Sequence, residues 1–242
     1  MRSENSNQAP WTVECDLLIA GVFEEEGLPA WLADRLPDDA ALNEDLDRSL
    51  GAVTRLYTQG ALVAPRLLLV GLGEREAFDR EALRTATAKA LRAAASGSGT
   101  HVAYALPDTS DLAPTDAARI VTETAEMALY NYSLTSLEDN STVEWLTLLG
   151  DDELEVGMAL GRAVAEGVLL CRDLVNGPPN LVTAPYLADT ARHIAESSPH
   201  IQVTVIHEDE AREMGMEAFA SVANGSTHPA QFIILEYRVE EL

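Results

Sequence analysis

Residues 172–187 read RDLVNGPPNLVTAPYL, and they separate a long helical pattern from a second run of helix and strand patterns. Gly177, Pro178 and Pro179 cannot continue a helix, because glycine favours the position just past a helix end and proline cannot donate the next backbone hydrogen bond. Thr183 can cap a new helix, and Pro185 falls near its first turn. The stretch therefore predicts a hinge between two packed units.

Before the hinge, apolar runs typical of strands alternate with segments whose apolar residues recur at helical spacing. This alternation predicts a mostly parallel sheet with helices on both faces. The expected strands are 13–20, 53–57 at an edge, 65–70 at the centre, 101–106 and 143–149. The expected helices are one or two short ones within 28–50, then 79–95, 114–130 and 151–176.

The helix at 151–176 is the longest pattern, and a helix of about 25 residues spans roughly 37 Å, enough to bridge two domains. After the hinge we expect helix at 184–196, strand at 201–206, helix at 208–214 and strand at 231–237. This is the start of a second α/β unit. Two strands are too few to form a stable sheet alone.

The charge balance is strongly acidic, because 16 basic residues stand against 40 acidic ones and the net charge is −24. Such a surface repels nucleic acid and anionic membranes, whose binding depends on clustered Lys and Arg. The first ten residues lack the pattern of a signal peptide, and no apolar run approaches the roughly 18–20 residues that cross a bilayer. We expect a soluble, cytoplasmic protein without nucleic-acid or membrane partners.

Lysine and cysteine are both scarce. The chain has one lysine, Lys89, so its other basic residues are arginine. A GC-rich genome accounts for this usage more simply than adaptation to high salt does. Cys15 and Cys171 lie far apart inside apolar patterns, which predicts buried, reduced thiols.

Two short motifs resemble ligand sites. Gly71-Leu72-Gly73 after a strand resembles a phosphate-binding turn, but Glu76 stands where the dinucleotide fingerprint requires a third glycine. A tight strand-to-loop turn explains it better, with a macrodomain-like nucleotide pocket as the weaker alternative. His207-Glu208-Asp209-Glu210 resembles a metal cluster, but adjacent residues point in different directions. Asp209 and Glu210 more plausibly face the start of the next helix.

Other reactive side chains lack suitable partners in the sequence. Ser226 is not in a Gly-x-Ser-x-Gly context, and no histidine has a metal-ligand partner at i+4. We therefore assign no catalytic, cofactor-binding or metal-binding residue to this chain.

The hinge carries a family resemblance. Residues 172–180 and 183–188 closely resemble the interdomain segment of leucyl aminopeptidases, the two-metal cytosolic peptidases. Residues 214–219 with Asn224-Gly225-Ser226 resemble the helix and Gly-Ser turn near the start of that family's catalytic domain, and 232–237 resembles the strand that follows. The resemblance is looser before the hinge, where residues 67–73 carry it.

The resemblance implies three parts: a macrodomain-like N-terminal α/β domain at 1–150, a linker helix at 151–177 and the incomplete start of a peptidase domain at 178–242. It implies an enzyme that removes N-terminal residues from peptides with two divalent ions, zinc or manganese, and that forms hexamers in the cytoplasm. The family's Gly-Lys-Gly and Asn-Thr-Asp-Ala-Glu-Gly-Arg motifs are not in this sequence, and no family role can be assigned to Lys89. We therefore expect this chain to be inactive alone.

Two alternatives remain open: a stand-alone macrodomain-like module that binds an ADP-ribose-type ligand or regulates a peptidase, and a scaffold for a separately encoded catalytic half. The β-prone run Phe232-Ile233-Ile234-Leu235 also predicts self-association, because its neighbouring strands are expected outside this sequence.

Overall fold

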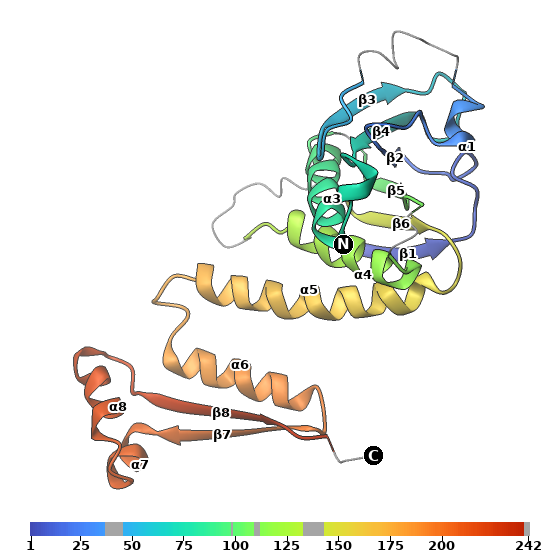
Figure 1. Cartoon of the computed structure of the whole chain (residues 1–242). Coiled ribbons are helices and arrows are strands. Elements are labelled where there is room, and N and C mark those ends of the chain that lie inside the picture. The colour runs from blue at the N-terminus through green and yellow to red at the C-terminus, as the bar shows by residue number, and fades with distance from the viewer. Residues whose placement is uncertain (37–45, 98, 109–111, 133–142, 240–242) are drawn as a thin grey trace. The chain divides into compact units, whose positions relative to one another are not determined.

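The structure is a computed structural model that describes residues 1–36, 46–97, 99–108, 112–132 and 143–239. It divides into two compact units, Met1–Arg172 and Asp173–Leu242. Each unit has its own sheet (Figure 1), and each is described by itself.

The first unit is built on a six-stranded sheet with strand order β1-β6-β5-β2-β4-β3. All neighbouring strands are parallel except β3, which pairs antiparallel with β4 at one edge. The strands are β1 (Arg2–Ser6), β2 (Leu17–Val22), β3 (Val53–Tyr57), β4 (Arg66–Gly71), β5 (His101–Ala105) and β6 (Trp145–Leu149). The helical segments are α1 (Ala30–Ala33), the 3-10 helix η1 (Arg75–Ala77), α3 (Arg80–Ala95), α4 (Pro114–Ala128) and α5 (Leu154–Asn176).

The two faces of this sheet carry separate cores, because successive strand residues point to opposite sides. On one face, Leu17 and Ile19 pack with buried residues of α3, α4 and the start of α5. On the other face, Leu18 and Ala20 pack with Leu32 of α1 and with residues of irregular segments. The long helices therefore cover one face, while the described residues that cover the other are the helical turn α1 and loops (Figure 1).

Helix α5 approaches α4 closely because small residues face the contact. A Cβ built on Gly157 would lie 2.0 Å from the carbonyl oxygen of Thr115, and one built on Gly161 would lie 2.6 Å from that of Arg119. Ala165 continues the same face and is buried. An adjacent face of α5, one residue earlier at each turn, exposes Val156, Leu160 and Val164.

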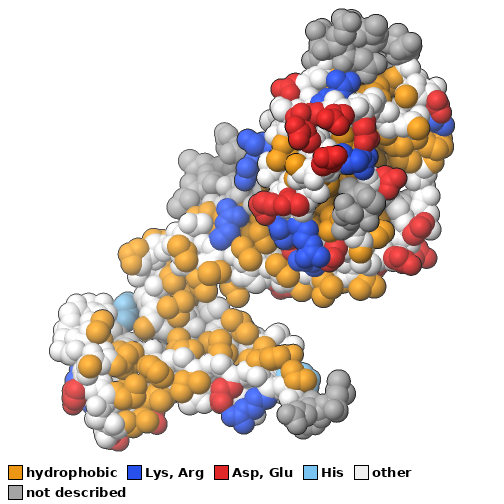
Figure 2. Space-filling view, viewed as in Figure 1, with side chains coloured by type: hydrophobic (Ala, Val, Ile, Leu, Met, Phe, Trp, Pro, Cys, Tyr) orange, Lys and Arg blue, Asp and Glu red, His pale blue; other side chains and the backbone are white. Residues whose placement is uncertain are grey.

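The second unit is a two-stranded antiparallel sheet with short helices. Its elements are α6 (Ala184–Glu196), β7 (Ile201–His207), α7 (Glu208–Glu213), α8 (Glu217–Val222), the 3-10 helix η2 (Ala223–Gly225) and β8 (Gln231–Tyr237). Among its described residues, the buried apolar ones are four alanines and one isoleucine: Ala188, Ala191, Ile206, Ala211 and Ala220. Hydrophobic side chains cover much of the visible surface of this unit (Figure 2), as expected for so small a core.

The expected α/β class, with a mostly parallel sheet flanked by helices, is confirmed. The hinge is also as expected: α5 ends at Asn176, and the Thr183 side chain accepts a hydrogen bond from the Tyr186 N–H at the start of α6. The expected helices within 28–50 appear as α1; residues 37–45 lie outside the described part of the chain.

One strand was not predicted, and two expectations need correction. The polar N-terminus contains a strand, β1, which pairs with β6 through its backbone at the sheet edge and so needs no apolar alternation. Cys171 is exposed and Cys15 is only half-buried, so the expectation of two buried thiols is wrong. The run Phe232–Leu235 is paired along β8 with β7, and only its other edge stays open among the described residues.

Candidate functional site

The first unit has a point where the connections of neighbouring parallel strands diverge. From β2 the chain continues to β3 and β4, which lie toward one edge of the sheet. From β5 it continues to β6, which lies toward the other edge. In open α/β sheets, ligands bind in the crevice outside the carboxyl ends of strands at such a switch point. The ends of β2 and β5 are therefore the candidate site of this unit.

A cleft of about 620 Å³ lies at this position. Its apolar wall includes Val22 and Phe23 at the end of β2, Trp31 of α1, and Leu106 with Pro107 after β5. The volume is within the range of roughly 300–1,000 Å³ typical of small-molecule pockets.

Arg75 is the charged group that spans this cleft. Its Nη2 donates to Glu26 Oε2 at 2.8 Å, its Nε donates to the other Glu26 oxygen, and its Nη1 donates to the Asp108 carbonyl at 2.9 Å. The guanidinium lies 4.0 Å from the centre of the Phe23 ring. The hydrogen bond from Arg75 lowers the pKa of Glu26. Arg75 is thus already satisfied by protein groups.

The glycine turn near this cleft has no backbone donor left for a phosphate. The N–H groups of Gly71, Leu72 and Gly73 donate to the carbonyls of Ala52, Val22 and Arg48 at 2.8, 2.8 and 3.1 Å. A positive φ of 72° at Gly73 explains the glycine there. These contacts support a tight structural turn rather than a dinucleotide fingerprint.

The cluster His207–Glu210 is used for local structure. Glu208 accepts hydrogen bonds from the Ala230 N–H at 3.0 Å and from Arg212 Nη2 at 2.9 Å, which ties α7 to the start of β8. The Ala230 bond is the largest cause of the lowered pKa of Glu208. Within the described ranges, no group of three or more His, Cys, Asp or Glu side chains is placed to hold a metal ion. These residues therefore do not fit a two-metal centre.

The remaining reactive side chains have separate local partners. His101 Nε2 lies 2.8 Å from Thr147 Oγ1, and His193 Nδ1 lies 2.8 Å from the Asp189 carbonyl oxygen. Ser226 Oγ accepts a hydrogen bond from the His228 N–H at 3.0 Å. Lys89 is exposed on α3, and its side chain lies near Gly51. The structure does not bring these groups together.

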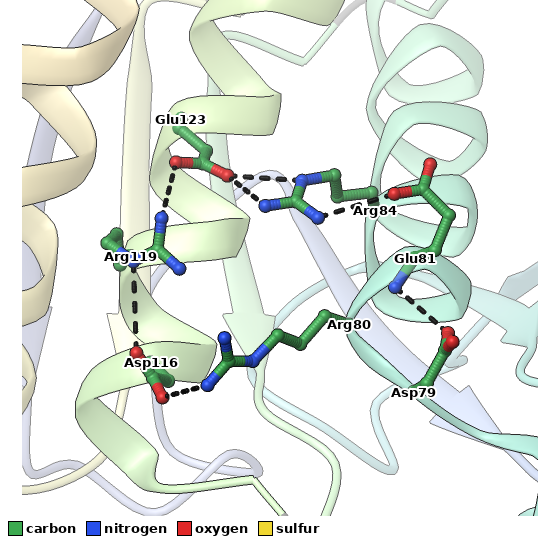
Figure 3. A network of polar contacts seen from close by, with 7 residues as sticks. All are labelled: Asp79, Arg80, Glu81, Arg84, Asp116, Arg119 and Glu123. Carbon is green, nitrogen blue, oxygen red and sulfur yellow. Dashed lines mark hydrogen bonds and ion pairs between the residues drawn. The ribbon is translucent and has the colours of Figure 1, made fainter.

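A network of ion pairs joins α3 to α4 (Figure 3). Glu123 on α4 is only 4% exposed, and its Oε1 accepts from Arg84 Nη2 at 2.8 Å, while its Oε2 accepts from Arg119 Nη1 at 3.2 Å. Asp116 and Arg80 form a second link at 2.8 Å between the helices. The i, i+4 spacing of Arg119 and Glu123 is readable in the sequence, but the Arg84–Glu123 pair depends on helix packing.

No described helix has the length and apolarity needed to cross a membrane.

Comparison with known families gives two matches along the chain. Residues 38–135 match the model of the cytosol aminopeptidase family, N-terminal domain, and residues 169–241 match that of the same family's catalytic domain. A probable cytosol aminopeptidase of Roseiflexus castenholzii is 36% identical over 94% of this chain and 47% of its own length. One of Chromohalobacter salexigens is 35% identical over 96% of this chain and 49% of its own length. The chain thus spans about half the length of the curated relatives that it matches.

Solved structures share the fold. A tomato leucine aminopeptidase mutant, K354E, has a TM-score of 0.80 at 24% identity and covers 99% of this chain with 51% of its own. The bottromycin maturation enzyme BotP in complex with Mn has a TM-score of 0.75 at 24% identity, over 91% of this chain and 45% of its own. At this level of identity the likeness concerns the fold alone.

Proposed function

The chain belongs to the cytosol aminopeptidase family, and we propose that it forms the amino-terminal half of a metal-dependent aminopeptidase that removes N-terminal residues from peptides. One observation carries the proposal: the models of the family's N-terminal and catalytic domains match this chain in that order. In this proposal residues 1–150 are the macrodomain-like domain, 151–177 the linker helix and 178–242 the start of the peptidase domain.

The proposed enzyme uses two divalent ions, zinc or manganese, which would supply water activation and carbonyl polarisation when bound. Since the described residues of this chain do not fit such a centre, we place the ligands on residues outside them. The proposed enzyme is a cytoplasmic homo-oligomer, a hexamer as the family resemblance implies. This chain then provides the scaffold on which the peptidase domain begins.

An assay of the purified chain with leucine p-nitroanilide and Mn²⁺ or Zn²⁺ tests whether peptide hydrolysis needs the carboxyl-terminal half. We expect no turnover by the chain alone, and turnover after it is mixed with or fused to the remaining carboxyl-terminal half of the Roseiflexus relative. The complete relative serves as the positive control. Turnover by the chain alone, or a fusion that folds but stays inactive, would contradict the proposal.

A second candidate is a binding or regulatory module, and the cleft at the ends of β2 and β5 favours it. Its ligand would be of the ADP-ribose type. The saturated N–H groups of the glycine turn and the neighbouring carboxylates Glu24, Glu26 and Glu74 argue against a diphosphate there. Calorimetry with ADP-ribose separates the two candidates: the peptidase proposal expects no binding heat.

A further inference from the structure

A second hollow of the first unit lies between α3, α4 and α5, away from the cleft just described. Its volume is about 540 Å³. We call it the arginine groove, because four of its lining residues are arginines. The residues that line it are Glu81, Arg84, Thr85, Ala88, Arg92, Arg119, Glu123, Thr124, Met127, Ala128, Val164 and Arg172.

The charge of this groove is opposite to that of the whole chain. Four arginines and two glutamates line it, whereas the chain carries a net charge of −24. The two acids are accounted for by the network of Figure 3: Glu123 is bound by Arg84 and Arg119, and Glu81 lies 3.3 Å from Arg84. Positive charge therefore remains on the other two arginines of the lining, Arg92 and Arg172.

Arg172 is held in place by contacts that, among the described residues, leave much of its donor capacity unused. Its Nη1 donates to the Met127 carbonyl at 2.9 Å, and its guanidinium lies 3.9 Å from the centre of the Tyr130 ring. Neither contact neutralises its charge. A fixed guanidinium is pre-organised for an anion, because little side-chain freedom is lost when the anion binds.

Arg92 is exposed on α3 and makes no side-chain hydrogen bond or ion pair with another residue in the described part of the chain. Thr85 and Thr124 add hydroxyl groups to the lining, and Ala88, Met127 and Val164 add apolar surface. The groove thus combines a fixed cation, a second cation without a described partner, and a hollow large enough for a small ligand.

We propose that the arginine groove binds a small multivalent anion, a polycarboxylate or a phosphate compound, through Arg92 and Arg172. The planar guanidinium fork matches both carboxylate and phosphate oxygens. Small size follows from the surrounding charge: a compact anion lies within a Debye length of about 8 Å of the arginines, whereas a long polyanion would extend over the acidic surface and be repelled. This site is separate from the proposed peptidase function, and its test does not depend on peptide hydrolysis.

The test is titration calorimetry of the chain in EDTA with sodium tripolyphosphate and, separately, with citrate, so that the two arms distinguish phosphate from carboxylate. We expect saturable binding of at least one anion, weakened about tenfold by Arg92→Gln, as for the loss of one charge-assisted hydrogen bond. Lys89→Gln is the control, because it removes one positive charge from the same helix at a position outside the groove. The affinity of this variant for the anion should differ from that of the wild type by less than twofold. Arg92 has no described partner and Lys89 is exposed. Both variants should therefore keep the wild-type circular dichroism spectrum and melting temperature.

Three outcomes would overturn the proposal. One is the absence of saturable binding of either anion at millimolar concentration, and another is equal weakening by Arg92→Gln and Lys89→Gln. The third is tighter binding of a single-stranded oligonucleotide than of tripolyphosphate, which would assign the groove to nucleic acid. Conversely, a fall in affinity as NaCl is raised from 20 to 300 mM supports an electrostatic site.

Discussion

A methyl group added to Gly157 would place its carbon 2.0 Å from the carbonyl oxygen of Thr115, well inside van der Waals contact. The neighbour is backbone and cannot rotate away, so α5 would have to move from α4. We expect Gly157→Ala to destabilise the chain by about 1–3 kcal/mol, as overpacking does. Urea denaturation followed by circular dichroism measures the change.

Gly167 offers the matched control, because it lies in the same helix and nothing lies within 4 Å of its built Cβ. Gly167→Ala should be neutral or stabilise by up to about 1 kcal/mol through helix propensity. Equal effects of the two substitutions would show that the close approach of α5 to α4 is not a constraint.

Asp16 is a second residue on which distant segments depend. Its Oδ2 accepts hydrogen bonds from the N–H groups of Thr100 and His101 at 2.8 and 3.0 Å, which joins the start of β2 to the start of β5. These bonds, above all that from His101, lower the pKa of Asp16. A carboxylate with a lowered pKa in the folded state stabilises the protein above its ordinary pKa, and this contribution is lost as the pH falls.

We therefore expect Asp16→Asn to cost about 1 kcal/mol at pH 7, after allowance for solvent screening, and less at pH 3. The measurement is the urea midpoint of wild type and variant at both pH values. Glu14→Gln, at an exposed neighbouring carboxylate, is the control and should change neither midpoint appreciably. A deficit for Asp16→Asn that grows on acidification would contradict the assignment.

At the scale of elements, β8 is an edge strand: among the described residues it has one strand neighbour, β7, and it exposes apolar side chains. Phe232 is 37% and Leu235 is 45% exposed. An open strand edge of this kind is a template for pairing with another chain. We expect the isolated chain to self-associate despite its net charge of −24, and Leu235→Lys to reduce the association.

Light scattering after size exclusion measures this association. Tyr57→Lys adds the same charge to the edge strand β3 of the other sheet, at a side chain that is 74% exposed, and should leave the association unchanged. A monodisperse wild-type monomer would refute the expectation.

At the scale of the whole molecule, the two units differ in the kind of core that they possess. The first unit buries leucine and valine on both faces of its sheet, whereas the described residues of the second unit bury mainly alanine. Burial of a large aliphatic side chain contributes about 1.5–3 kcal/mol, and alanine contributes much less. We expect hydrogen exchange to be slowest in β2, β4 and β5 and much faster in β7 and β8.

Exchange measured by mass spectrometry on peptides of the intact chain tests this order. Similar protection of the two units would contradict it, because the unit with the smaller apolar core should open at lower free energy. If the carboxyl-terminal half of a relative completes the peptidase domain, its addition should slow exchange in β7 and β8 and leave β2 unchanged.

The sequence by itself determined the α/β class, the hinge and most of the elements, because these depend on short-range periodicity and on local turn chemistry. Thr183 and Gly177-Pro178-Pro179 act within a few residues of themselves, so their effect is readable without the fold. The family resemblance had the same source, since it rested on contiguous residues around the hinge.

Only the tertiary structure decided what depends on segments far apart in the chain. It placed β1 beside β6 and paired Arg75 with Glu26 and Arg84 with Glu123. It also gathered Arg92 and Arg172 from two helices into one groove of an acidic protein. Such contacts follow from the packing of whole elements and from backbone pairing, and neither leaves a periodic signal at the residues concerned.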